Sequence, residues 1–115
     1  MSYVDGCVIA VPDANKQTYL EHTKTMAVVF KEFGATRVVD CWGDDVPDGK
    51  LTDFRGAVKA EAGETVVFSW IEWPSKEARD AAWKTVMEDP RMRGIEMPFD
   101  GKRMIFGGFQ TISDL

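Results

Sequence analysis

The sequence predicts an α+β protein of the ferredoxin-like class, formed as a single domain over residues 1–115. Four short segments rich in Val, Ile and aromatic residues alternate with two longer segments of helical spacing, in the order β-α-β-β-α-β. In this order two right-handed crossovers place both helices on one face of a four-stranded antiparallel sheet. A chain of 115 residues is typical of one domain, and its hydrophobic content of 44% is enough for a buried core.

The first half of the chain predicts a strand, a helix and a second strand. Residues 3–11 (YVDGCVIAV) form the first strand, which Pro12 ends. The first helix is expected from about Ala14 to Phe33, with Asp13 capping its start and Gly34 ending it in a left-handed conformation. Residues 35–43 (ATRVVDCWG) predict the second strand. The apolar stripe of the helix consists of Leu20, Met26, Ala27, Phe30 and Phe33.

The second half begins with a long polar connection, followed by the strongest strand of the chain. In this connection, residues 44–63, the apolar residues near Phe54 fit either one helical turn or an extended edge. Residues 64–73 (ETVVFSWIEW) predict a strand that is apolar on both faces. Ser75 is suited to cap a second helix, which ends near Asp89.

The sheet face that the helices leave uncovered is predicted to be apolar. Residues 103–112 form the fourth strand, which alternates Met104 and Phe106 against Ile105 and Phe109. Together with the doubly apolar third strand, this leaves an apolar face that marks an interface. Closed two-fold dimers are the commonest homo-oligomers, so we expect a homodimer whose sheets pack face to face.

Charge and composition exclude several classes of partner. The net charge is −5, which opposes nucleic acid and anionic membrane surfaces. RNA-recognition domains share the element order and stack bases on strand aromatics, but the acidic charge argues against that class. No segment is typical of a membrane span or a signal peptide, so a cytoplasmic location is expected.

No metal site and no cofactor are expected. The only candidates for soft ligands are Cys7, Cys41 and His22, too few for a structural zinc site. The third strand should lie between the two cysteines and hold them roughly 10 Å apart, beyond disulfide reach. Both are therefore expected to be free thiols.

Five segments carry a resemblance to a known family: YVDGCVIAVP, WGDDVPDGKLTDF, ETVVFSWIEWPSKEARDAA, DPRM and MPFDGKRMIFGGF. They resemble the YbaA-like family of small bacterial proteins, which is similar in fold to the dimeric α/β-barrel superfamily. The resemblance spans residues 3–114 and implies this fold and a dimer. Enzymes of the wider superfamily act on small, often aromatic molecules, but the family brings no catalytic residues to carry over.

Four residues are the candidates for a site. His22 projects from the apolar side of the first helix and could act as a general base, or it could simply be packed there. Asp5 lies among apolar neighbours in the first strand, where desolvation raises a carboxyl pKa; its structural alternative is an ion pair with Lys102 or Arg103. Trp42 and Trp70 could form the walls of a ligand pocket, or they could belong to the core or the dimer interface. Asp40, in the second strand, is a weaker carboxylate candidate.

The sequence supports two functional hypotheses and does not decide whether the protein is an enzyme. In the first, a cytoplasmic homodimer binds or converts a small organic molecule, for example an aromatic one, in a pocket between the helices and the sheet. That pocket would contain His22, Asp5 and at least one of Trp42 and Trp70. In the second, the protein is a non-catalytic homodimeric stress or partner-binding module whose aromatic residues only pack.

Overall fold

A computed structural model describes residues 2–115. The strands are β1 (Tyr3–Pro12), β2 (Arg37–Trp42), β3 (Glu64–Trp73) and β4 (Ile105–Gln110), and the helices are α1 (Lys16–Glu32), α2 (Phe54–Ala57) and α3 (Lys76–Val86). Short 3-10 turns cover Asp13–Asn15, Pro90–Met92 and Gly101–Arg103. Within the described residues, no helix combines the length and the apolar character needed to cross a membrane.

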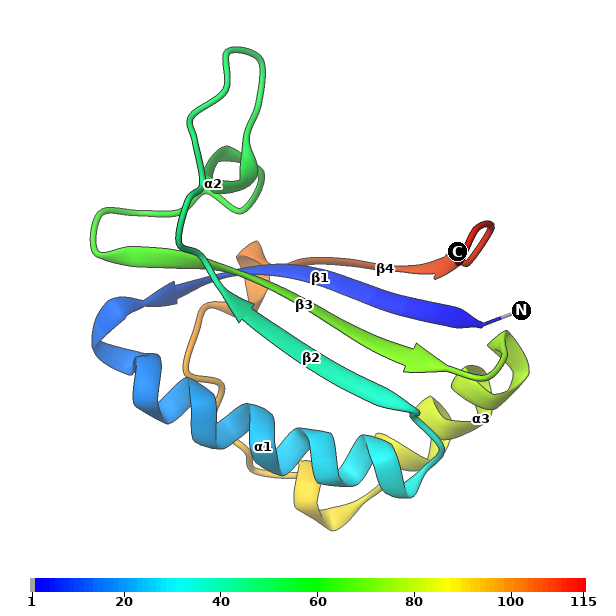
Figure 1. The fold of residues 1–115 in the computed structure, drawn as a ribbon. Coiled ribbons are helices and arrows are strands. Elements are labelled where there is room, and N and C mark those ends of the chain that lie inside the picture. Colours follow the sequence, from blue (N-terminus) through cyan, green and yellow to red (C-terminus); the bar gives the residue numbers. More distant parts are fainter. Residues whose placement is uncertain (1) are drawn as a thin grey trace.

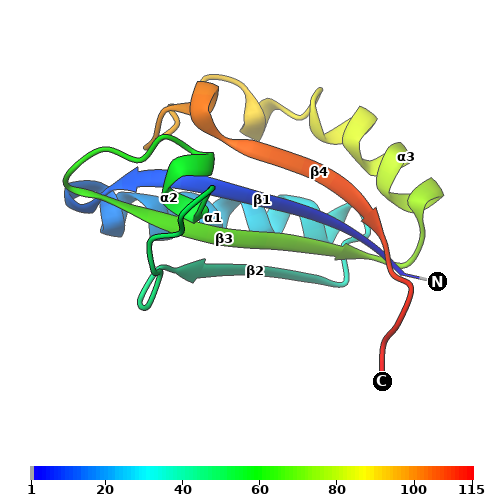
Figure 2. The same ribbon diagram turned by 90° about the horizontal axis from the view of Figure 1, so that it is seen from above.

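The four strands form one antiparallel sheet in the order β2-β3-β1-β4. The central strands β1 and β3 pair along their whole length, from Tyr3 opposite Trp73 to Pro12 opposite Glu64. Helices α1 and α3 lie on one side of the sheet and α2 lies on the other, as Figures 1 and 2 show. This arrangement confirms the predicted α+β class and is compatible with the ferredoxin-like fold.

The side chains of the sheet divide into two faces because successive residues of a strand point in opposite directions. The face toward α1 and α3, called here the helix face, contains the fully buried side chains of Val11, Val67 and Trp73. Trp73 packs against helix residues Val29, Phe30, Ala82 and Val86, whereas Val11 and Val67 pack with Tyr19 of α1. The opposite side, called here the open face, presents Phe68 and Trp70 of β3 and Phe109 of β4.

The segment between β2 and β3 is anchored over one end of the open face. Its short helix α2 resolves the choice left open by the sequence in favour of a helical turn, which Asp53 caps by accepting a hydrogen bond from the amide of Gly56. Val58 follows α2 and is completely buried against the strand residues Val8, Ala10 and Val66. The guanidinium of Arg55 donates to the carbonyls of Glu61 and Glu64 at 3.0 and 2.8 Å.

Two expectations at the start of the first helix are wrong. Asp13 does not cap α1, because its carboxylate instead accepts a hydrogen bond from the hydroxyl of Thr65 and a 3-10 turn precedes the helix. Leu20 is 44% exposed, whereas its neighbour Tyr19 is buried. Adjacent residues of an α-helix are about 100° apart around its axis, so which of two neighbours is buried depends on how the helix lies on the sheet.

The other boundaries agree with the sequence to within a few residues. Gly34 ends α1 with a φ of 115°, and Ser75 caps α3 by accepting from the amide of Ala78 at 3.1 Å. The fourth strand begins at Ile105 rather than Arg103, because Arg103 belongs to a 3-10 turn that Asp100 caps.

Candidate functional site

Asp5 lies on the helix face of β1 inside a network of four side chains. Its carboxylate accepts hydrogen bonds from the indole nitrogens of Trp73 and Trp83 at 2.8 and 2.9 Å. The guanidinium of Arg79, on α3, contacts both carboxylate oxygens, the shortest distance being 2.8 Å. The ring of Tyr3 lies 5.3 Å from the guanidinium carbon. Both oxygens of this carboxylate therefore accept hydrogen bonds. Two of the donors, Arg79 and Trp83, belong to α3, so the network holds this helix on the sheet.

This network corrects the ion-pair partner expected for Asp5. Arg103 binds Glu64 at 2.7 Å and Asp100 at 3.0 Å instead, at the other end of β3. Asp5 pairs with Ile71 and Gly108 across the sheet, far along the strand from Glu64, which faces Pro12. A basic residue near β4 in sequence is thus too far along the sheet to reach Asp5, whereas Arg79 on α3 lies directly over it.

His22 belongs to a second cluster, in which its neighbours are Tyr19 and Phe99. The centroid of the His22 ring lies 6.4 Å from the centroid of the Tyr19 ring and 6.3 Å from that of the Phe99 ring. Burial lowers the pKa of His22 below its ordinary value, and the negative charge of Asp40 opposes this shift. Burial therefore favours the neutral form of the imidazole.

The phenol of Tyr19 links this second cluster to the sheet. Its hydroxyl donates a hydrogen bond to Oδ1 of Asp40 at 2.8 Å. Burial raises the pKa of Tyr19 well above its ordinary value, and the charge and hydrogen bond of Asp40 raise it further. Tyr19 thus remains a neutral donor that fixes the orientation of an otherwise exposed carboxylate.

A cleft of about 400 Å³ opens beside this pair, between α1 and the β2 edge of the sheet. Tyr19, Leu20 and Lys16 line it from α1, and Asp40 and Trp42 line it from β2. The ammonium of Lys16 lies 5.1 Å from the centre of the Trp42 ring. The cleft therefore combines a cation, a carboxylate and an aromatic wall, and its volume is within the range of small-molecule sites.

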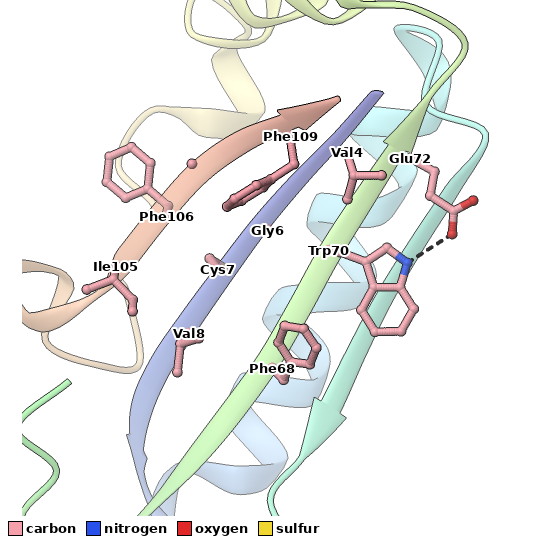
Figure 3. A pocket seen from close by; sticks show the side chains of 11 residues that line it. Val4, Gly6, Cys7, Val8, Phe68, Trp70, Glu72, Ile105, Phe106 and Phe109 are labelled. Atoms are coloured by element: carbon pink, nitrogen blue, oxygen red, sulfur yellow. Dashed lines mark hydrogen bonds between the residues drawn. The ribbon is translucent and has the colours of Figure 1, made fainter. Parts of the chain in front are cut away.

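A larger groove of about 650 Å³ runs along the open face (Figure 3). It contains Trp70 and Phe68 of β3, and the ring of Phe109 lies across Gly6 in the neighbouring strand. Its one charged side chain, Glu72, accepts a hydrogen bond from the indole nitrogen of Trp70 at 2.9 Å. This groove is almost wholly apolar and suits a broad apolar partner better than a polar ligand.

The two cysteines lie on different strands and on different faces. Cys7 of β1 faces Ser69 of β3, and Cys41 of β2 faces Phe68 on that same strand, so β3 separates them as expected. Both are free thiols. Burial raises the pKa of Cys7 to about 11, and the hydrogen bond with Ser69 opposes that rise.

Among the residues that the structure describes, the four candidates do not share one set of neighbours. Trp42 lines the α1–β2 cleft and Trp70 lines the open-face groove, while Asp5 and His22 line neither of these two hollows. The participation of Asp5 and His22 in a ligand pocket remains a prediction. Sequence reasoning missed Lys16 and the pairing of Tyr19 with Asp40, although Tyr19 precedes His22 by one helical turn and its position offered a signal.

The fold and its two hollows define a small α+β protein with an open apolar sheet face and a polar cleft beside its first helix. Residues 2–101 match the family model described as "Protein of unknown function (DUF1428)", and the chain belongs to this family. It is 64% identical over 116 residues to the "Uncharacterized protein YbaA" of Escherichia coli strain K12 and to that of Shigella flexneri, with 99% of each chain covered. The resemblance to YbaA-like proteins seen in the sequence is thereby confirmed.

Proposed function

We propose that this protein is a cytoplasmic homodimer that binds a small organic molecule, one per subunit, in the α1–β2 cleft. The cleft is the observation that carries the proposal, because convergent polar groups beside an aromatic wall are typical of ligand sites. Tyr19 holds Asp40 in place, and Trp42 supplies a flat surface on which a ring could stack. The proposed site retains Trp42 from the sequence prediction, and His22 is a ring neighbour of Tyr19 outside the cleft lining.

Asp5 has a different role in this proposal. Its carboxylate already accepts hydrogen bonds from Arg79, Trp73 and Trp83, so Asp5 stabilises the α3 side of the core. Any chemistry on a bound molecule would therefore fall to the Tyr19, His22 and Asp40 group. Of these, Asp40 and Tyr19 line the cleft. His22 does not line it and would act on a ligand only through its ring neighbour Tyr19.

The homodimer is supported by the open face. Phe68, on the central strand β3, is 48% exposed, and Phe109, on the edge strand β4, is 59% exposed. The charged groups around these rings are already paired at the rim, where Arg37 lies 3.7 Å from Glu72. An apolar centre with charges at its rim is the usual composition of a protein interface, and a second copy presents the matching surface.

The ligand proposal is tested by a screen of small aromatic and heteroaromatic fragments, read by quenching of tryptophan fluorescence. A fragment that binds in the cleft should lose affinity in Trp42→Leu and keep it in Trp70→Leu, with both melting temperatures recorded as folding controls. A loss of fragment affinity in Trp70→Leu alone would place the ligand in the open-face groove. If no fragment binds the parent protein, the non-catalytic homodimer becomes the better hypothesis.

A further inference from the structure

We propose that the ligand of the α1–β2 cleft is amphoteric: it carries an anionic group for Lys16, a cationic or strongly donating group for Asp40, and a planar apolar part for Trp42. This inference rests on the proposed function, because it names the class of molecule for the same cleft. It comes from the two charges that face the cleft, neither of which forms an ion pair within residues 2–115.

Lys16 is a free cation at the mouth of the cleft. Its ammonium makes no ion pair with any carboxylate of residues 2–115 and lies only over the Trp42 ring. By contrast, Arg79, Arg91 and Arg103 each bind a carboxylate at short distance. Lys16 therefore keeps its donors available to an anionic group placed against the indole.

Asp40 supplies the complementary charge from the opposite wall. Only its Oδ1 is occupied, by the Tyr19 hydroxyl, and within the described chain Oδ2 accepts no hydrogen bond. Because the buried phenol is held neutral, Tyr19 fixes the carboxylate without cancelling its charge. A ligand ammonium or amide can thus bind Oδ2 at little cost of reorganisation.

The apolar part of the ligand is defined by the rest of the cleft. Trp42 is half-buried, and Leu20 and Val67 line the same hollow. Cation, anion and ring thus meet within about 400 Å³, a volume suited to a compact molecule rather than a polymer. A molecule with one charge would leave either Lys16 or Asp40 without a partner after the cleft is desolvated.

A matched series of three probes tests this class: L-phenylalanine carries both charges, 3-phenylpropanoate only the negative one, and 2-phenylethylamine only the positive one. Binding is followed by amide and indole shifts in ¹H–¹⁵N NMR spectra, which show whether the cleft or the open face is occupied. We expect L-phenylalanine to bind at least about tenfold more tightly than either of the others, since each charged contact is worth roughly that factor.

Two charge variants assign the contacts. Lys16→Gln should lower the affinity for L-phenylalanine to that for 2-phenylethylamine. Asp40→Asn should lower it to that for 3-phenylpropanoate. Lys24→Gln, on α1 but outside the cleft, and Asp44→Asn, in the connection after β2, are the controls that should change nothing.

The outcomes separate the inference from the proposed function. If a singly charged probe binds the cleft as tightly as L-phenylalanine, or if either cleft variant has no effect, the amphoteric class is wrong but the cleft remains a binding site. If none of the three probes moves a cleft resonance, the amphoteric class is also wrong, and the fragment screen then decides whether the cleft binds anything.

Discussion

Arg79 of α3 holds Asp5 of β1 through three hydrogen bonds, in which Nε reaches both carboxylate oxygens at 3.0 and 3.1 Å and Nη2 reaches Oδ1 at 2.8 Å. The side chains are only 25% and 14% exposed, so the pair is shielded from water on most sides. Two indole donors complete the coordination of the same carboxylate. The pair connects β1 to α3 across 74 positions of the chain.

The first prediction follows from this shielding. Asp5→Ala would leave the Arg79 guanidinium and two indole N–H groups without their acceptor, and we expect a loss of about 2–4 kcal/mol in the free energy of unfolding. Asp80→Ala is the matched control, because Asp80 binds the same guanidinium at 2.9 Å but is 46% exposed, and it should cost less than about 1 kcal/mol. Urea unfolding measures both. Equal losses of unfolding free energy in the two variants would show that the shielding of Asp5 does not strengthen its contacts.

The strands were predictable because their pattern is local. The segment 64–73 coincides with β3, since its run of Val, Phe, Ile and Trp is typical of a strand buried on both faces. The sheet order followed from the order of elements and the handedness of crossovers. These are properties of neighbouring residues and of chain connectivity, so one sequence is enough to indicate them.

The partners of the candidate residues were not predictable in the same way. Asp5 meets Arg79 across 74 positions, and Tyr19 meets Asp40 across 21. Helical and strand spacing indicates which face a side chain occupies, but not which side chain on another element lies opposite it. The cleft depends on that second kind of information, because it exists only where α1 crosses the β2 edge.

The second prediction concerns acid stability. The hydrogen bonds of Arg103 lower the pKa of Glu64 from 4.5 to about 2, although burial acts in the opposite direction. Because the folded-state pKa lies below the unfolded one, the stabilising effect is complete above about pH 4.5 and is lost as the pH falls toward 2. Glu64→Gln should therefore be less stable than the parent at pH 7, and the difference should shrink between pH 4.5 and 2.

Thermal unfolding of both proteins across this range measures that difference. Asp89→Asn is a useful comparison, because Arg91 lowers the pKa of Asp89 to about 2 at a separate place. The two effects should add, since the groups share no partner. A difference between parent and Glu64→Gln that stays constant with pH would show that Glu64 does not titrate in this window.

The third prediction concerns the thiols. At pH 8 a group with a pKa of about 11 is thiolate in only about one molecule in a thousand, and Cys7 is also largely covered. Exposed Cys41 should react with a disulfide reagent in the native protein, whereas Cys7 should react only after unfolding. Cys41→Ser should remove the fast phase and Cys7→Ser the slow one. Fast reaction of both thiols would show that β1 is more accessible than the fold implies.

The fourth prediction tests the dimer through the open face. Phe68→Ser should raise the dimer dissociation constant by more than about tenfold, because central aromatic residues usually dominate interface energy. Val28→Ser is the control: Val28 is 55% exposed on α1, away from this face, and should leave the constant unchanged. Sedimentation at micromolar concentration distinguishes a dimer from a chain of 12.9 kDa. A parent protein that is monomeric under these conditions would refute the homodimer.

The last prediction uses the sole histidine of the chain as a probe of the cleft. Burial lowers the pKa of His22 below 6.5, while the Asp40 carboxylate partly restores it. Asp40→Asn removes that charge, so the pKa of His22 should fall further. Because protonation of His22 is disfavoured in the folded state, the contribution of this residue to stability is present above pH 6.5 and is lost as the pH falls below that value.

Titration of the single imidazole by ¹H NMR measures the pKa directly, without any problem of assignment. We expect a value below 6.5 in the parent and a lower one in Asp40→Asn, whereas Asp44→Asn, in the exposed connection after β2, should leave it unchanged. An unchanged His22 pKa in Asp40→Asn would mean that the cleft carboxylate has no electrostatic effect on the imidazole. That result would remove the electrostatic link between the imidazole and the cleft, on which a joint role of His22 and Asp40 depends.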